Sequence, residues 1–315
     1  MFKIVFIYAT VKRNVKMKLE ETIAKLKKEK NALILAHNYQ NPDVQDIADY
    51  TGDSLELSRI AAKNDADIIV FCGVHFMAES AYILSPQKKV ILPDSSAGCP
   101  MADMADVDSI LEMKKKYPEA AIVTYINSSA AVKAASDICV TSSNAVSIVN
   151  KLNEETILFV PDKNLAHYVQ RFTNKKIIPW DGFCPTHEKF TKEDLIAIKN
   201  QFPDAYVMVH PECRHEVIDL ADNTLSTGQM VNYISHIYHK QIIVGTEKGM
   251  LHKLKKISPE KEFILASPDF ICPNMKKISL EKILHALINE EPIVSVQEDI
   301  RVKALQSLQR MLELS

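Results

Sequence analysis

Glycine is scarce in this chain, and the common glycine-rich motifs are missing. Seven of the 315 residues are glycine, whereas about 7% is the usual share in soluble proteins. The sequence has no G-x-G-x-x-G segment and no G-x-x-x-x-G-K-[ST] segment. We therefore do not expect a nucleotide held by a glycine-rich loop. Any phosphate would be bound by hydroxyl groups and helix N-termini instead.

Long apolar runs and a large net charge are also missing. No apolar segment approaches the ~18 residues of a transmembrane helix, and 38 basic against 40 acidic residues give a formal net charge of −2. A nearly neutral chain is not expected to bind nucleic acid or a membrane surface through charge. The apolar stretch 2–11 has no small-residue cleavage site and is not expected to be a signal peptide. We therefore expect a cytoplasmic protein without nucleic-acid or membrane partners.

Six cysteines are present, and in a cytoplasmic chain they are expected as free thiols, metal ligands or catalytic groups. Cys72 and Cys139 lie in or near apolar segments and are predicted to be buried core thiols. Cys213 follows a polar segment and is also interpreted as structural. The other three, Cys99, Cys184 and Cys272, are each followed by proline.

The spacing of the Cys-Pro pairs indicates an internal repeat. Their separations are 85 residues, from 99 to 184, and 88 residues, from 184 to 272. Seven residues after each cysteine stands a residue type that favours a helix N-cap: Asp106, Thr191 and Ser279. An amphipathic segment follows each N-cap, at 107–117, 192–202 and 280–289. Each repeat unit is therefore about 86 residues long.

Short apolar segments recur in each unit, as is typical of buried parallel strands. The expected strands are 32–37, 68–71 and 90–92, then 121–125, 157–160 and 177–179, then 205–210, 242–244 and 263–265. A hydroxyl-rich turn precedes a helical pattern in each unit, at 50–54, 140–144 and 225–229. We predict an α/β fold of three pseudo-symmetric, three-layer αβα domains with parallel sheets around a pseudo-threefold axis. The alternative is one long doubly wound domain with chance cysteine spacing.

The repeat also predicts the domain boundaries. The first unit is expected at 18–104 with Cys99, the second at 105–189 with Cys184, and the third at 190–290 with Cys272. A helix within 291–315 is expected to pack back on the surface.

Polar side chains follow the predicted strands at the edge where parallel sheets bind ligands. The first strands lead to residues 37–39, 125–127 and 210–212, and the turns contribute Ser54, Ser142 and Thr227. Under threefold packing these positions and the three cysteines face one cavity. His37, Tyr39, Tyr125, His210 and Glu212 are candidate acids and bases. Hydroxyls at helix N-termini suit a phosphate or a carboxylate.

Three cysteines, one per domain, can bind a single metal centre. Three thiolates hold zinc with water as the fourth ligand. They also hold a [4Fe–4S] cluster by three corners, which leaves one iron without a protein ligand. Such an iron is a Lewis acid. The sequence spacing does not separate the two centres. A role for the turn 246–250, which follows a strand, also stays open.

Several segments together resemble quinolinate synthase. They are AHNYQ (36–40), TGDSLELS (51–58), AGCPMADM (97–104), YINSSA (125–130), HPEC (210–213), STG (226–228), TEKGMLHKL (246–254) and CPNMKKI (272–278). The likeness runs from about residue 18 to 290, and nothing functional is carried onto residues 1–16. The resemblance implies one [4Fe–4S] cluster held by Cys99, Cys184 and Cys272. It implies a substrate cavity lined by His37, Ser54, Tyr125, Asn127, Ser142, His210, Glu212 and Thr227.

The resemblance also implies a reaction. Iminoaspartate condenses with dihydroxyacetone phosphate to quinolinate, with release of phosphate and water, and this supplies the pyridine ring of NAD. The open iron acts as a Lewis acid in dehydration, and Glu212, His37, Tyr39, His210 and Tyr125 are the expected catalytic residues. Because an imine hydrolyses in water, a transient contact with an aspartate-oxidising enzyme is a further expectation.

Three other functions fit parts of the pattern. A radical enzyme of the diphthamide-biosynthesis type also places one cysteine per domain around a [4Fe–4S] cluster, and a need for S-adenosylmethionine would select it. A zinc hydrolase on the same scaffold would contain zinc and no sulfide. A small-anion binding protein with a structural metal would show affinity without product.

Overall fold

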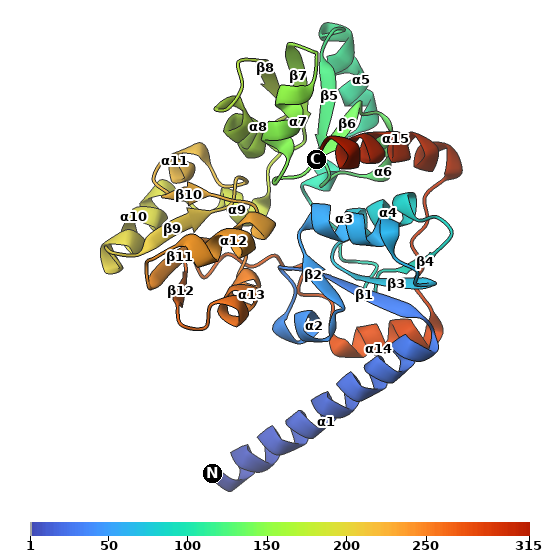
Figure 1. Ribbon diagram of the computed structural model, residues 1–315, viewed down its shortest axis with the longest axis vertical. Coiled ribbons are helices and arrows are strands. Elements are labelled where there is room, and N and C mark those ends of the chain that lie inside the picture. The colour runs from blue at the N-terminus through green and yellow to red at the C-terminus, as the bar shows by residue number, and fades with distance from the viewer. Residues whose placement is uncertain (1) are drawn as a thin grey trace.

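The molecule has three lobes, each built on one parallel sheet (Figure 1). The computed structural model describes the backbone of residues 2–315 and the side chains of residues 14–315. The three sheets have four strands each and the same strand order, in which the first strand along the chain lies between the second and the third. This repeated topology confirms the predicted α/β fold class.

The first sheet has the order β2-β1-β3-β4. Its strands are β1 (Ala32–His37), β2 (Tyr50–Gly52), β3 (Ile68–Cys72) and β4 (Lys89–Ile91). The helices of this part of the chain are α1 (Phe2–Glu29), α2 (Pro42–Ile47), α3 (Ser54–Lys63) and α4 (His75–Leu84), followed by the short 3-10 helix η1 (Ala102–Met104). All five residues of β3 are buried, as expected for a parallel strand covered on both faces.

The second sheet has the order β6-β5-β7-β8. Its strands are β5 (Ala121–Tyr125), β6 (Ile138–Val140), β7 (Thr156–Val160) and β8 (Lys176–Pro179). Its helices are α5 (Val107–Lys116), α6 (Ala130–Ala134), α7 (Ala145–Lys151) and α8 (Lys163–Gln170). Asp106 accepts a hydrogen bond from the Ser109 amide and so begins α5 as the N-cap, as the sequence predicts.

The third sheet has the order β10-β9-β11-β12. Its strands are β9 (Tyr206–Val209), β10 (Asn223–Thr224), β11 (Gln241–Gly245) and β12 (Glu262–Leu265). The short helix α9 (Pro185–Glu188) follows β8 of the second sheet, and the helices of the third lobe are α10 (Lys192–Gln201), α11 (His215–Ile218), α12 (Thr227–Tyr233), η2 (Ile234–His236) and α13 (Met250–Ile257). The predicted N-cap Thr191 forms a capping box with Asp194 at the start of α10.

A short edge strand follows the first strand of every sheet. From the sequence we expect three or four strands in each unit and a turn at 50–54. In the structure, residues 50–52 of that segment form β2, which pairs with β1 so that Leu35 lies opposite Tyr50. The edge strands β2, β6 and β10 are only two or three residues long. Such segments are too short for their hydrophobic pattern to reveal them, because the periodicity test needs about four residues or more.

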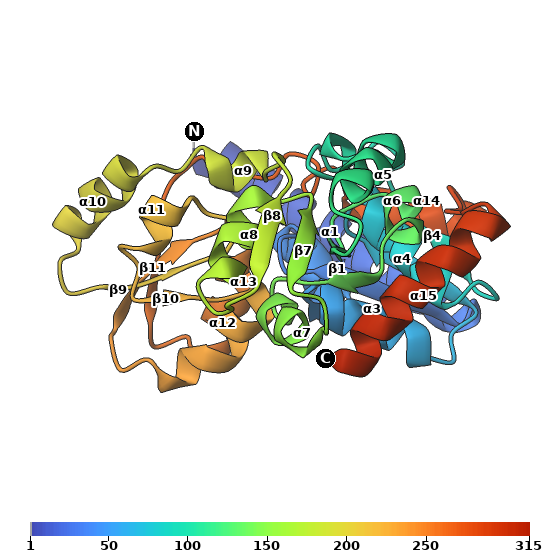
Figure 2. The ribbon, with the colours of Figure 1, turned by 90° about the horizontal axis from the view of Figure 1, so that it is seen from above.

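The two C-terminal helices pack on lobes that precede them in the chain. Helix α14 (Leu280–Asn289), capped by Ser279, contacts α1 and β3 of the first lobe instead of extending the third. Helix α15 (Glu298–Leu314) contacts α6, β6 and α4, and Figure 2 shows it crossing that side of the molecule. The division at 18–104, 105–189, 190–290 and 291–315 stays a prediction. Among residues 2–315, no helix has the length and the apolar character needed to cross a membrane.

We expect α15 to stabilise the fold through one apolar face. Leu308 is fully buried on this helix, whereas Val302 on the same helix is 43% exposed. Leu308→Ala is therefore expected to lower the free energy of unfolding by about 2–5 kcal/mol through lost burial and a residual cavity. Val302→Ala is the control and is expected to change it by no more than about 0.5 kcal/mol. Chemical denaturation followed by circular dichroism measures both, and equal values would show that α15 is not anchored this way.

Candidate active site

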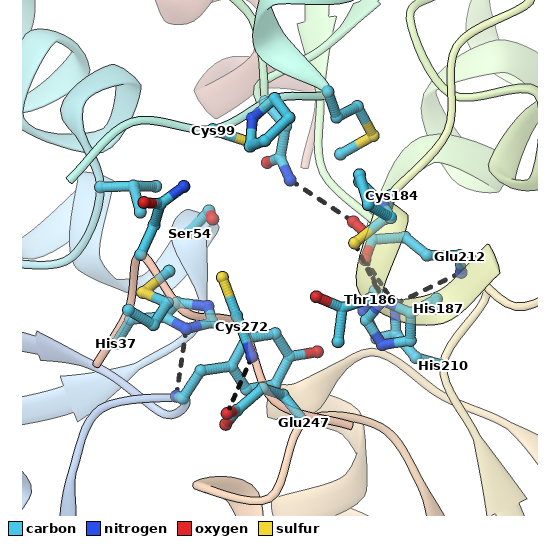
Figure 3. Close-up of a pocket in the computed structure, with 18 of the residues that line it drawn as sticks. His37, Ser54, Cys99, Cys184, Thr186, His187, His210, Glu212, Glu247 and Cys272 are labelled. Atoms are coloured by element: carbon cyan, nitrogen blue, oxygen red, sulfur yellow. Dashed lines mark hydrogen bonds and ion pairs between the residues drawn. The ribbon is translucent and has the colours of Figure 1, made fainter. Parts of the chain in front are cut away.

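The side chains predicted for the site lie around one cavity between the three lobes (Figure 3). The cavity has a volume of about 180 Å³. The lining includes all twelve predicted site residues: His37, Tyr39, Ser54, Cys99, Tyr125, Asn127, Ser142, Cys184, His210, Glu212, Thr227 and Cys272. The structure therefore brings together every residue that the sequence placed in the site, while their individual roles stay predictions.

The repeated topology explains this convergence. His37 ends β1, Tyr125 ends β5, and His210 directly follows β9. These are the first strands of the three sheets, and the carboxyl ends of parallel strands share one edge. Ser54 and Thr227 are the first residues of α3 and α12, so their hydroxyls enter the cavity at helix N-termini.

The cysteines of the three Cys-Pro pairs lie in the segments that follow the last strand of each sheet. Cys99 follows β4, Cys184 is the residue before α9, and Cys272 follows β12. Figure 3 shows the three side chains around a common space. All three are free thiols. Burial raises the pKa of Cys99 to about 12, and the nearby charge of Cys272 adds to this increase.

The donor set fits an iron–sulfur group better than a single zinc ion. Sulfur binds zinc at about 2.3 Å, so two sulfurs on one zinc ion lie at most about 4.6 Å apart. Among the described residues, the three cysteine sulfurs do not form a set within 4.8 Å of one another. Cys184, His187 and Glu212 do lie within that distance, but hydrogen bonds between them explain their closeness. The three thiols are compatible with an iron–sulfur cofactor.

The other three cysteines lie away from this cavity. Cys72 and Cys139 are completely buried in the core, which confirms the prediction for both. Cys213 is also completely buried, and its Sγ lies 3.5 Å from the Gly245 carbonyl oxygen. It packs in the core of the third lobe with Val209 and Ile243. This burial supports the interpretation of Cys213 as structural, which stays a prediction.

Glu212 is the central carboxylate of the cavity. Its Oε1 accepts a hydrogen bond of 2.8 Å from the Tyr125 hydroxyl, and Asn127 Nδ2 lies 3.4 Å from the same oxygen. Its Oε2 lies 2.8 Å from Nδ1 of His187 and 3.5 Å from Nδ1 of His210. Burial opposes the charged form, yet the two histidines and the hydrogen bonds lower the pKa of Glu212 below its usual value. Glu212 is therefore held as a buried carboxylate.

His37 and His210 occupy equivalent positions and make equivalent backbone contacts. The Tyr39 amide donates to Nδ1 of His37 at 3.2 Å, and the Glu212 amide donates to Nδ1 of His210 at 3.3 Å. Burial lowers the pKa of His37 to about 4 and of His210 to about 3, so both rings are neutral near pH 7. With Nδ1 accepting, Nε2 carries the proton in each ring. Both histidines are therefore equipped to donate a hydrogen bond to a ligand oxygen.

Asn127 has an unused acceptor at the cavity. Its Nδ2 points to Glu212, while its Oδ1 is buried and has no hydrogen-bond partner among the described residues. A buried acceptor without a partner costs about 1–3 kcal/mol. A donor on a bound ligand would satisfy this oxygen.

Sequence reasoning missed His187, which lies beside Glu212. It follows Cys184 by three residues in the short helix α9 and is almost completely buried. Its Nδ1 lies 3.2 Å from Cys184 Sγ, and its Nε2 lies 2.9 Å from Oγ1 of Thr246. In the sequence, the only feature that could have pointed to His187 is its position about one helical turn after Cys184, a candidate metal ligand.

The turn 246–250, whose role was left open, belongs to the wall of the site. Glu247 lines the cavity, is fully buried, and accepts hydrogen bonds from the Cys272 amide at 3.3 Å and from Lys276 Nζ at 3.0 Å. Lys276 also donates to the Tyr39 carbonyl oxygen. This ion pair therefore joins the Cys272 loop of the third lobe to the first lobe. Sequence reasoning missed Glu247 and Lys276 as a pair.

Glycine is needed at one point of this turn. A Cβ atom on Gly249 would lie 2.6 Å from the Tyr39 carbonyl carbon and oxygen and 2.8 Å from the Gln40 oxygen. These are backbone atoms, which cannot move aside cheaply. In the same contact region between the two lobes, Gln45 Nε2 donates a hydrogen bond of 2.9 Å to the Gly249 carbonyl oxygen. The backbone of the third lobe at Gly249 therefore packs directly against the backbone of the segment that carries Tyr39.

Comparison with known proteins identifies the family. The family described as quinolinate synthetase A protein (NadA) matches residues 21–313. A quinolinate synthase of Geobacter sp. (strain M21) is 55% identical over 296 residues, which are 94% of this chain and 97% of that protein. A quinolinate synthase of Dehalococcoides mccartyi (strain CBDB1) is 53% identical over 94% of this chain and 98% of that protein. Quinolinate synthase 1 of Methanosarcina acetivorans is 51% identical over 93% of this chain and 97% of that protein.

These matches agree with the resemblance in the sequence motifs. None of the three relatives carries the name of a radical enzyme, a zinc hydrolase or a binding protein. With nearly the whole chain matched, and with three cysteines and an acid–base cluster meeting in one cavity, the chain belongs to the quinolinate synthase family of enzymes.

Proposed function

We propose that this chain condenses iminoaspartate with dihydroxyacetone phosphate to quinolinate, releasing phosphate and water, in the supply of the pyridine ring of NAD. The observation that carries the proposal is the meeting of three kinds of group in one cavity: three thiols, an acid–base cluster around Glu212, and hydroxyls at helix N-termini. Membership of the family supports the same reaction.

Cys99, Cys184 and Cys272 would hold one [4Fe–4S] cluster. One thiol comes from each lobe, and a cluster held by three of its four irons keeps one iron without a protein ligand. When bound, the group supplies a Lewis acid to the dehydration chemistry of the site. Glu247 supports this arrangement because its carboxylate accepts a hydrogen bond from the Cys272 amide and orients that loop.

Ser54, Ser142 and Thr227 would bind the anionic groups of the substrates. Their hydroxyls reach the cavity from equivalent positions in the three lobes. Asn38 Nδ2 donates to Thr227 Oγ1 at 3.1 Å, so the Thr227 hydroxyl proton is free to donate to a ligand. Hydrogen-bond donors and helix N-termini stabilise the negative charge of a phosphate leaving group, so we place the phosphate beside these three hydroxyls.

Glu212, His37 and Tyr39 would handle the proton transfers between the two substrates. The enamine form of iminoaspartate attacks the phosphate-bearing carbon, phosphate leaves, and ketone converts to aldehyde before the nitrogen closes the ring. Each of these steps moves a proton at carbon, nitrogen or oxygen. Glu212 is the ionised acceptor, and the neutral rings of His37 and His210 donate hydrogen bonds to carbonyl or carboxylate oxygens. Tyr125, which donates to Glu212, holds that carboxylate in place.

Two chemical properties bear on the source of iminoaspartate and on the cellular compartment of the reaction. An imine hydrolyses in water, so an aspartate-oxidising enzyme in transient contact would deliver it. All six cysteines are free, which fits a reducing, cytoplasmic setting.

The hydroxyl positions can be tested one at a time. Ser142→Ala is expected to raise the KM for dihydroxyacetone phosphate at least about tenfold, because a hydrogen bond to a charged group contributes about 1.5–3 kcal/mol. Ser147→Ala is the matched control, since Ser147 is an exposed serine on α7 of the same lobe and does not line the cavity. Steady-state kinetics with varied phosphate substrate gives both values. An unchanged KM for Ser142→Ala would remove this residue from the anion site.

The proposed function is tested by product formation. The protein is purified without oxygen and supplied with dihydroxyacetone phosphate and with iminoaspartate generated in the cuvette from aspartate. We expect pyridine-2,3-dicarboxylate and inorganic phosphate in equal amounts, identified by chromatography and mass. Iron-loaded protein that yields neither would overturn the proposal.

A further inference from the structure

Lys133 is a fully buried lysine that the proposed reaction does not use. It lies in α6, and no part of its surface is exposed. Its Nζ donates a hydrogen bond of 2.5 Å to the Ser128 carbonyl oxygen and lies 3.5 Å from the Phe76 carbonyl oxygen. Nζ also lies 5.3 Å from the centre of the Phe76 ring, within the range of a cation–π contact. No described carboxylate forms an ion pair with Lys133, so backbone carbonyl groups are its main partners.

A lysine in this position costs free energy, because an ammonium group loses its hydration when it is buried. Burial lowers the pKa of Lys133, and the charge of Glu79 offsets part of this effect. A methionine of similar length would fill the same space without that cost. The hydrogen bonds of the ammonium group are therefore the property that an apolar side chain cannot supply here.

The Ser128 carbonyl group belongs to the loop that carries Asn127 to the cavity. Tyr125 ends β5, and Asn127 lines the cavity two residues later. The Ser128 amide donates to the Ile126 carbonyl oxygen at 2.8 Å, and the Ser128 hydroxyl donates to the Tyr125 carbonyl oxygen at 3.0 Å. These two hydrogen bonds hold the start of the loop, and the hydrogen bond from Lys133 holds its far end. The position of the Asn127 side chain therefore depends on both.

The Phe76 carbonyl group belongs to the neighbouring first lobe. Phe76 and Met77 stand in the first turn of α4 and line the cavity. On the same helix, the Glu79 carboxylate accepts a hydrogen bond of 3.1 Å from the Ala130 amide, at the start of α6. Lys133 and Glu79 therefore tie α6 of the second lobe to α4 of the first, at residues that line the cavity or stand next to one that does.

Helix α15 fixes Lys133 from the other side. It packs on both α6 and α4 (Figures 1 and 2). Ser307 of α15 donates a hydrogen bond of 2.8 Å to the Lys133 carbonyl oxygen. The backbone of Lys133 is therefore held by α15, while its side chain holds the loop that carries Asn127.

We propose that Lys133 is a positioning residue for substrate binding, because it holds the Asn127 loop so that the free acceptor of Asn127 meets the N–H group of iminoaspartate. The inference rests on the proposed function, since that reaction supplies the ligand. Asn127 Oδ1 is buried without a described partner, and Asn127 Nδ2 lies 3.4 Å from Glu212. The phosphate of the other substrate is placed beside the hydroxyls at the helix N-termini. The N–H group of the imine is therefore the donor that we assign to the Glu212 end of the cavity.

Lys133→Met is expected to raise the KM for iminoaspartate about three- to tenfold, the effect of one lost hydrogen bond, and to keep kcat within about twofold of wild type. A variant that is only less stable would contain less active enzyme, which lowers kcat and leaves KM unchanged. Rates of quinolinate formation are measured with the imine varied through its hydrolysis products, oxaloacetate and ammonium. Lys133→Gln, whose amide is too short for the same hydrogen bond, is expected to give the same result and keeps the test independent of one variant's folding.

Lys88→Met is the matched control. Lys88 is a buried lysine that does not line the cavity, and its Nζ lies 2.6 Å from Asn64 Oδ1. This variant is expected to change KM less than about twofold, because it loses a comparable hydrogen bond away from the substrate. A double-mutant cycle then identifies the residue through which Lys133 acts. In protein that already carries Asn127→Ala, Lys133→Met is expected to change KM less than about twofold.

A measurement without turnover follows the loop itself. Amide hydrogen exchange of the segment 125–134 is measured by mass spectrometry in the wild type, Lys133→Met and Lys88→Met. We expect faster exchange in Lys133→Met alone, because the loop then opens locally more often.

The outcomes distinguish this inference from the proposed function. Wild-type protein that makes no quinolinate overturns the proposed function, and faster exchange in Lys133→Met then still supports a role in holding the loop. Active wild type with an unchanged KM in both Lys133 variants overturns the inference alone. Unchanged exchange in Lys133→Met also overturns it, as does a rise in KM that is equally large with Asn127→Ala already present.

Discussion

Glu212→Gln is expected to leave the iron–sulfur absorption of the protein intact and to lower kcat by about 10²–10⁴-fold. Glutamine has nearly the same size, but it cannot accept a proton as a carboxylate does. Its amide also places a donor where Glu212 accepts from both Tyr125 and His187. One of these two hydrogen bonds is therefore lost, and the proton acceptor of the cavity is gone.

The measurement is the rate of quinolinate formation alongside iron and sulfide contents. Glu188→Gln is the control, because Glu188 is a nearby carboxylate that accepts from Asn164 at 2.9 Å and does not line the cavity. It is expected to keep activity within a few-fold of wild type. A fully active Glu212→Gln variant would remove Glu212 from the acid–base chemistry.

Serine at any one of Cys99, Cys184 or Cys272 is expected to abolish both iron binding and turnover. Each thiol is the single cysteine that its lobe contributes to the cavity, so no neighbouring cysteine in the described lining can replace it. A cluster left with two cysteine ligands loses iron, and the dehydration chemistry loses its Lewis acid. Iron and sulfide analysis and the absorption spectrum of anaerobically purified protein measure the first effect.

Cys139→Ser is the matched control for these three variants. Its Sγ lies 3.4 Å from the Ser307 hydroxyl in the core, so a serine there retains a hydrogen-bond partner. The control is expected to bind a full complement of iron. If one of the three cavity variants also keeps its iron and activity, that cysteine is not a ligand.

The cavity was predictable from the sequence because its residues stand at repeated positions. The spacing of Cys99, Cys184 and Cys272 revealed three units, and the strand ends at His37, Tyr125 and His210 then fell at one edge of each sheet. In parallel sheets, chain direction alone decides where such ends meet. Fold class and site composition therefore followed from local pattern and topology.

The contacts between lobes were not predictable in this way. Helix α14 follows the third sheet along the chain but packs on α1 and β3 of the first lobe. The Tyr39 hydroxyl meets Thr246, which is 207 positions away in sequence. Such partners have no spacing rule, because they depend on how whole lobes pack against each other. His187 was missed for the same reason, since its neighbours Glu212 and Thr246 come from the third sheet.

One measurement tests the central claim most directly, namely that three cysteines from three lobes hold one cluster with an open iron. Mössbauer spectra of isotope-enriched, anaerobically loaded protein are recorded with and without pyridine-2,3-dicarboxylate. We predict four irons per chain, of which one changes its isomer shift on adding the dicarboxylate while the other three do not. A full set of irons with no change in any of them, or one zinc per chain without sulfide, would contradict the claim.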